Sequence, residues 1–125
     1  MLDIHGQSRR WFTIMRGTLS GGAVTHWLEN HGGWASVMGP ESILGYMAQQ
    51  GRSIWPADPL AIETELNGGY ITGVYSQQLP NVDVIQLESG RFLRTWGRRS
   101  YALDLANGIK VFYDTYLVGE AHEIN

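Results

Sequence analysis

The chain has 125 residues, 43% of them hydrophobic and 17% charged, with a formal net charge of −3. This size and composition predict one globular domain and exclude a disordered tail. The chain has no cysteine, which excludes disulfides and zinc–thiolate sites, and the acidic balance gives no overall field that would attract nucleic acid or an anionic membrane. No apolar run approaches the ~18 residues of a membrane-spanning helix, and no signal peptide is evident, so we expect a cytoplasmic protein.

The first part of the chain, to about residue 55, is predicted to be mainly helical. The short apolar run Arg9–Arg16 contains Ile and Thr, so we expect a strand there. Ser20 can cap a helix over Gly22–His31. The same Ser20-Gly21-Gly22 stretch resembles an anion-binding amino terminus, but it lacks a lysine and a strong preceding strand, so a simple cap is the favoured interpretation.

A second helix is predicted between Pro40 and Gly51. Proline suits the first helical position because its φ is fixed near the helical value, and Gly51 can adopt the left-handed conformation that ends a helix. The pairs Trp55-Pro56 and Asp58-Pro59 then require extended backbone. The helical part of the chain should therefore end near residue 55.

From about residue 59 to residue 116, turn residues predict an antiparallel β-meander of about six strands. Leu60–Leu66 and Tyr70–Ser76 would pair around Asn67-Gly68-Gly69, with Glu63 and Glu65 on one solvated face. Three more hairpin turns follow, at Glu88-Ser89-Gly90, Gly97-Arg98-Arg99 and Asn107-Gly108. The predicted fold is a single α+β domain over residues 1–125, with two amino-terminal helices packed on the meander.

The last four strands have a register that follows from these turns. It places Ile85, Leu93, Leu103 and Phe112 opposite one another as a core stripe. The period of two then gives the other face an unusual mixture of aromatic and charged residues: Val84, Phe92, Arg94, Trp96, Ala102, Asp104, Val111 and Tyr113. Because two short helices can cover only one face of this sheet, the uncovered apolar face argues for a ligand or for self-association into a homodimer.

The first candidate site is the arginine and aromatic set on the distal hairpins. Trp, Tyr and Arg are the residues enriched at binding hot spots. The alternative is that the rings face the helices as core and that the turn arginines are simply solvated. Nucleic-acid binding by the same residues is disfavoured by the acidity of the chain and by Asp104. The predicted partner-binding residues are Phe92, Arg94, Trp96, Arg98, Arg99, Asp104 and Tyr113.

Motifs for catalysis are absent, since the chain has no GxSxG, SxxK or HExxH sequence, and we expect no metal and no cofactor. The one candidate is the pair His26 and Glu29, which are three positions apart and could meet on one helix face as a base and its orienting carboxylate. With Tyr46 or Tyr70 they would form an alternative pocket between the helices and the sheet.

The sequence thus favours a small non-enzymatic protein that binds and occludes a macromolecular partner, most simply a protein. Its profile is analogous in type, though not similar in sequence, to small inhibitory proteins of mobile elements, anti-CRISPR proteins included. A small enzyme or a small-molecule binding domain, using the alternative pocket, is the second hypothesis.

Overall fold

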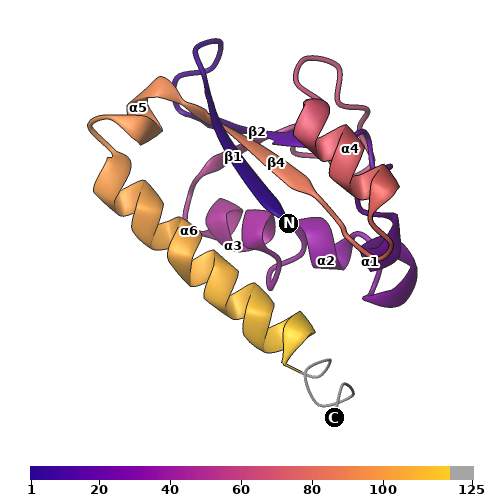
Figure 1. Cartoon of the computed structure of the whole chain (residues 1–125). Coiled ribbons are helices and arrows are strands. Elements are labelled where there is room, and N and C mark those ends of the chain that lie inside the picture. Colours follow the sequence, from indigo (N-terminus) through magenta and orange to yellow (C-terminus); the bar gives the residue numbers. More distant parts are fainter. Residues whose placement is uncertain (119–125) are drawn as a thin grey trace.

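The computed structural model describes residues 1–118, which form a four-stranded mixed sheet with helices on both sides (Figure 1). The remaining positions of the predicted domain, 119–125, lie outside the described residues. The strands are β1 (Leu2–Gln7), β2 (Thr13–Gly17), β3 (Ser53–Trp55) and β4 (Ile85–Gly90), and their order in the sheet is β1-β4-β2-β3. The α+β class is confirmed, whereas the arrangement of its elements differs from the prediction.

The last strand in the sequence lies between the first two in the sheet. β4 pairs parallel with β1, where Leu2 is opposite Ile85, and antiparallel with β2, where Ile14 is opposite Ser89. β3 pairs parallel with β2 at the other edge. Parallel neighbours need long connections, which here carry the helices.

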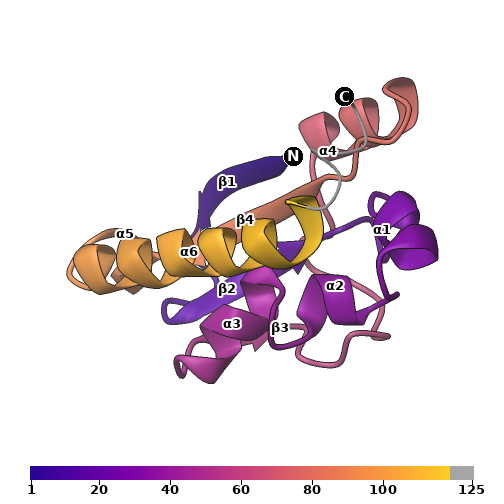
Figure 2. The same ribbon diagram turned by 90° about the horizontal axis from the view of Figure 1, so that it is seen from below.

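Six α-helices lie among the described residues, and they are distributed on both faces of the sheet. Figure 2 shows α2, α3 and α6 on one side of the sheet and α4 on the other. The helices are α1 (Thr25–Asn30), α2 (Ala35–Met38), α3 (Ile43–Gln49), α4 (Tyr70–Gln78), α5 (Arg91–Arg94) and α6 (Arg98–Phe112), and α6 continues into the π-helix η1 (Tyr113–Leu117).

Helix α3 confirms the second predicted helix. Its N-cap is Ser42, whose Oγ accepts a hydrogen bond from the backbone N–H of Gly45 at 2.9 Å. It stops before Gly51, which has the expected left-handed φ of 86°. The helix predicted over Gly22–His31 is shorter, because α1 begins at Thr25 after a tight turn.

The core lies between the sheet and α2, α3 and α6. Leu44 and Met47 of α3 are fully buried against Ile14 and Leu87 of the sheet, and α6 adds Tyr101 and Leu105 to the same cluster. In β4, Leu87 lies on this side. The opposite side carries Gln86, whose amide oxygen accepts a hydrogen bond from Thr72 Oγ1 of α4.

The predicted hairpin around Asn67-Gly68-Gly69 is wrong. Residues 56–69 contain no strand, and the second predicted arm is the helix α4. The expected alternation is also inverted, because Ile62 is 74% exposed and Glu63 is buried. The physical reason is tertiary, since Glu63 bonds to groups on β2 and the turn after it that lie more than 40 positions away in the sequence.

The six-stranded antiparallel meander and its last three hairpins are also wrong. Leu93 lies in α5, and Leu103 and Phe112 lie in α6, so they do not form a cross-strand stripe. Residues 107 and 108 are interior positions of α6. The buried positions of α6 recur every three or four residues, at Tyr101, Leu105 and Gly108, which is a helical period. The face predicted to join Phe92 to Tyr113 is therefore not a sheet face.

Candidate functional site

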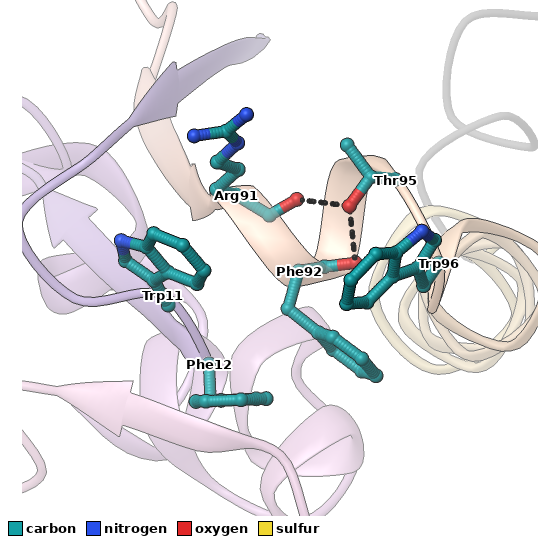
Figure 3. Close-up of a pocket in the computed structure, with 6 residues that line it drawn as sticks. All are labelled: Trp11, Phe12, Arg91, Phe92, Thr95 and Trp96. Atoms are coloured by element: carbon teal, nitrogen blue, oxygen red, sulfur yellow. Dashed lines mark hydrogen bonds between the residues drawn. The ribbon is translucent and has the colours of Figure 1, made fainter.

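A hollow of about 320 Å³ opens between the loop that joins β1 to β2 and the segment that joins β4 to α6 (Figure 3). We call it the aromatic pocket, because four of its six lining residues carry aromatic rings. In the view of Figure 3, Trp11 and Phe12 lie on one side, Phe92 lies between them and Trp96, and Arg91 lies above. The lining residues are Trp11, Phe12, Arg91, Phe92, Thr95 and Trp96.

The first wall of the aromatic pocket is a loop built around the buried amide of Gln7. Its Nε2 donates to the carbonyls of Arg10 at 2.8 Å and Thr13 at 3.1 Å, and its Oε1 accepts from the N–H of Arg10 at 2.8 Å. A single side chain thus satisfies the backbone on both sides of Trp11 and Phe12. This fixes the loop while leaving the two aromatic side chains outside the core.

The second wall begins where β4 passes directly into α5. A Cβ on Gly90 would lie 2.3 Å from the carbonyl oxygens of Arg10 and Trp11, so only glycine allows the two walls to approach this closely. The N–H of Phe92 donates to the carbonyl of Trp11 at 3.1 Å. At the other end, Gly97 lies directly against the ring of Phe92. The pocket is therefore assembled by backbone contacts between segments about 80 residues apart.

The rings of the aromatic pocket are exposed to an unusual degree. Trp96 is 89% exposed, Phe12 is 62% exposed and Trp11 is 51% exposed. Phe12 and Phe92 contact each other with ring centroids 4.8 Å apart. Single exposed apolar residues need no explanation, but a contiguous group of aromatic residues on a surface is typical of a binding site.

One arginine lines the aromatic pocket and two more follow it directly in the chain. The guanidinium of Arg91 lies over the ring of Trp11, 5.4 Å from its centroid. Arg98 and Arg99 begin α6, directly after the pocket, and both are exposed. Within residues 1–118, no ion pair engages any of these three arginines. Among the described residues, these three cations in or next to the pocket therefore have no acidic partner.

The other predicted partner-binding residues have different roles or lie elsewhere. The guanidinium of Arg94 donates to the carbonyls of Ser89 at 3.0 Å and Gln7 at 3.3 Å, so it joins the ends of β4 and β1. Asp104 pairs with Arg52 at 2.6 Å. Tyr113 lies one α6 length from the pocket, about 22 Å along the helix axis. The structure brings together only Phe92 and Trp96 of the predicted set, with Arg98 and Arg99 beside them.

A second cavity, of about 400 Å³, lies between α1, α6 and the sheet. His26 lies at this cavity and is oriented by Asp83, whose Oδ2 is 3.3 Å from its Nδ1 and whose Oδ1 accepts its backbone N–H at 3.1 Å. The other residues of the predicted alternative pocket do not line the cavity. Glu29 and Tyr70 are exposed on α1 and α4, and Tyr46 packs on α6 beside Gly108.

The predicted partner-binding set lacks Trp11, Phe12, Arg91 and Thr95 of the aromatic pocket, and the predicted alternative pocket lacks Asp83. A signal for the first two was present, because Trp11-Phe12 is an adjacent aromatic pair that follows Arg9-Arg10 and precedes a strand. In a strand, alternation would send one of the two rings into the core and the other to solvent. A turn before the strand instead leaves both rings outside the core, and this is the arrangement that the structure shows. Asp83 gave no local signal, since its partner His26 is 57 positions away.

None of the helices within residues 1–118 combines the length and the apolar character that a membrane-spanning segment requires. The same residues contain no cluster of three or more His, Asp or Glu side chains that could hold a metal ion. Comparison with known proteins gave no match to a family model, to a curated protein or to a solved structure.

Proposed function

We propose that the protein binds a protein partner through the aromatic pocket and acts by occluding the partner's surface, without catalysis. The observation that supports this most directly is the exposure of Trp96, which is 89% accessible although it is the largest type of side chain. Trp and Arg are the residues most enriched among binding hot spots. The two walls of the aromatic pocket are held by hydrogen bonds to their backbone, and such preorganisation lowers the entropic cost of binding.

The chemistry of the pocket indicates the kind of partner segment. Its floor and walls are apolar rings, which favour an inserted aliphatic or aromatic side chain. Its rim carries Arg91, and Arg98 and Arg99 follow at the start of α6, which favour carboxylates around that side chain. The expected partner segment is therefore an acidic peptide with one large apolar anchor.

The second hypothesis, an enzyme or a small-molecule binding domain, has less support because its predicted site residues do not lie together. His26 lies at the second cavity, but Glu29, Tyr46 and Tyr70 are dispersed over three helices. The base and its orienting carboxylate would need to be His26 and Asp83, and the described residues that line that cavity with them include no serine, threonine or lysine. The aromatic pocket therefore has the stronger claim.

The proposal is tested by selecting peptides from a random display library on the wild-type protein and measuring their affinities for variants. We expect enriched peptides that combine Asp or Glu with Leu, Phe or Trp. Trp96→Ala should weaken their binding about 30-fold, which corresponds to a typical hot spot of about 2 kcal/mol. Raising the salt concentration should weaken binding further, because the rim charges are exposed.

The matched control is Tyr70→Ala, which removes an exposed aromatic ring from α4, on another part of the surface. It should leave peptide affinity unchanged, and thermal unfolding should show that both variants are folded. Peptides that bind Trp96→Ala as tightly as wild type would contradict the proposal. A library that enriches no peptide would contradict it as well.

A further inference from the structure

Residues 56–69, which we call the strap, join β3 to α4 across the surface and contain no helix or strand. The strap buries an acid and exposes its apolar residues, which is the reverse of the usual preference. Glu63 is 4% exposed, whereas its neighbour Ile62 is 74% exposed and Leu60 is 73% exposed. The strap is attached to the domain by polar contacts, of which the buried ones centre on Glu63; Glu65 also pairs with Arg10 at 2.7 Å, and the N–H of Glu63 donates to Oγ of Ser20 at 3.0 Å.

The carboxylate of Glu63 lies in a complete set of hydrogen-bond donors. Its Oε1 accepts from the backbone N–H groups of Thr18 at 2.7 Å and Ser20 at 2.8 Å. Its Oε2 accepts from Nε of Arg16 at 2.8 Å and from Oγ1 of Thr18 at 2.8 Å. We call Arg16, Thr18 and Ser20 the cradle. Two donors for each oxygen is the pattern that suits a carboxylate.

The cradle belongs to β2 and the turn after it, not to the strap. Leu19 and Ser20 have φ of 52° and Gly21 has φ of 94°, so three successive residues are left-handed. Two of them, Leu19 and Ser20, are not glycine. A positive φ costs free energy at such residues, and residues of this kind cluster at functional sites. Successive residues in such conformations turn backbone N–H groups into a concavity that binds anions. Of the Ser20-Gly21-Gly22 stretch, only Ser20 donates its N–H to the carboxylate of Glu63, because the N–H groups of Gly21 and Gly22 bond to Thr18 and Leu19.

The guanidinium of Arg16 is only partly satisfied by the strap. The side chain of Arg16 is fully buried, and its Cζ lies over the ring of Trp34, 5.5 Å from the ring centroid. Nη2 makes long hydrogen bonds to two strap carbonyls, those of Asp58 at 3.5 Å and Ala61 at 3.3 Å. Nη1 has no hydrogen-bond partner among residues 1–118, although it is buried. A buried arginine usually has all its donors paired, so this one has capacity for a further acceptor.

We propose that the cradle is a binding site for the carboxylate group of a small ligand, and that Glu63 occupies it in cis. A ligand carboxylate enters as the strap moves away, takes the four donors that Glu63 releases and gains Nη1 or Nη2 of Arg16 in addition. The exchange conserves charge, because one carboxylate replaces another beside Arg16. This site is independent of the aromatic pocket, with which it shares no residue.

The test is chemical rescue of Glu63→Ala by formate, the smallest carboxylate. Removing the side chain leaves Arg16 buried without its counter-ion, so this variant should be less stable than wild type. Formate should raise its melting temperature by about 5 °C at tenfold excess over the dissociation constant, relative to chloride at equal ionic strength. The matched control is Glu65→Ala, which removes an acid of the same strap that pairs with Arg10, and formate should not rescue it.

Displacement of the strap is tested in the wild-type protein. Formate should shift the amide resonances of Thr18 and Ser20 saturably and should increase hydrogen exchange in the strap. This measurement also covers the case in which Glu63→Ala does not fold. No rescue together with no saturable shift would show that Glu63 is only a structural ion-pair partner. A stronger response to inorganic phosphate than to formate would overturn the assignment to carboxylates.

Discussion

At the scale of single residues, polar side chains organise this protein as much as apolar ones do. The amide of Gln7 supports one wall of the aromatic pocket, and the carboxylate of Glu63 holds the strap. Tyr101 is a third case, because its ring is in the core and its hydroxyl hydrogen-bonds to Oγ of Ser89 in β4. Burial raises the pKa of this hydroxyl above its usual value of 10.0, although the bond to Ser89 opposes the shift.

The raised pKa of Tyr101 predicts how stability depends on alkaline pH. In the unfolded chain the hydroxyl ionises near pH 10.0, whereas in the folded protein it keeps its proton to higher pH. The free energy of unfolding should therefore be insensitive to this group below pH 10. Above pH 10 it should decrease, by up to about 1.4 kcal/mol per pH unit, until the folded pKa is reached. Urea unfolding of wild type and Tyr101→Phe as a function of pH measures the difference. Equal alkaline losses in both proteins would contradict the prediction.

At the scale of elements, the same local sequence supports two structures, and packing selects one. Asn107-Gly108 is a strong hairpin signal, yet both residues lie in α6. A Cβ on Gly108 would lie 3.2 Å from the carbonyl of Ile43, so glycine here allows α6 to approach α3 closely. The glycine that suggested a turn is used for close helix packing, which costs about 1 kcal/mol of helix propensity relative to Ala.

Asn107→Ala distinguishes the two structures directly. In the exposed interior of a helix, alanine is favoured over asparagine, so the variant should be about 0.5 kcal/mol more stable than wild type. In a tight hairpin turn, alanine would need a positive φ and would destabilise the protein instead. Urea unfolding measures the sign, and the helical signal in circular dichroism should be retained. A loss of stability would contradict the assignment of residue 107 to α6.

At the scale of the whole molecule, one core unites segments from both halves of the chain. The cluster joins Ile14 of β2, Leu44 of α3, Leu87 of β4 and Leu105 of α6. The opposite side of β4 carries Gln86 and Glu88, which hydrogen-bond to each other. The second apolar sheet face, which argued for a homodimer, is therefore not present on β4. Light scattering on the purified protein measures its molar mass and so tests the expected homodimer independently.

The shared core predicts that the described part of the chain unfolds as one unit. Leu44 is fully buried at the centre of the cluster, so Leu44→Ala should lower the free energy of unfolding by about 3 kcal/mol. Tryptophan fluorescence and far-ultraviolet circular dichroism should show coincident transitions in both proteins. Leu60→Ala, at an exposed position of the strap, should change stability by less than about 0.5 kcal/mol. Separate transitions for the two probes would contradict a single cooperative core.

The sequence by itself determined the features that depend on neighbouring residues. Gly51 ends α3 as predicted, because a left-handed stop acts within one turn of a helix, whereas Pro40, expected at the first helical position, lies before the N-cap Ser42. The strand near Arg9–Arg16 was found for a similar reason, although β2 lies later, at Thr13–Gly17. For the candidate site, Phe92 and Trp96 were identified from their residue types, and the arginines that follow them were identified in the same way.

Only the tertiary structure decided the features that join distant segments. The sheet order places β4 beside β1, about 80 residues apart, and no local pattern encodes that pairing. The aromatic pocket depends on the same pairing, because it brings Trp11 to Phe92 through a backbone hydrogen bond. The burial of Glu63 depends on donors more than 40 positions away, which is why an alternating, strand-like sequence became an irregular strap.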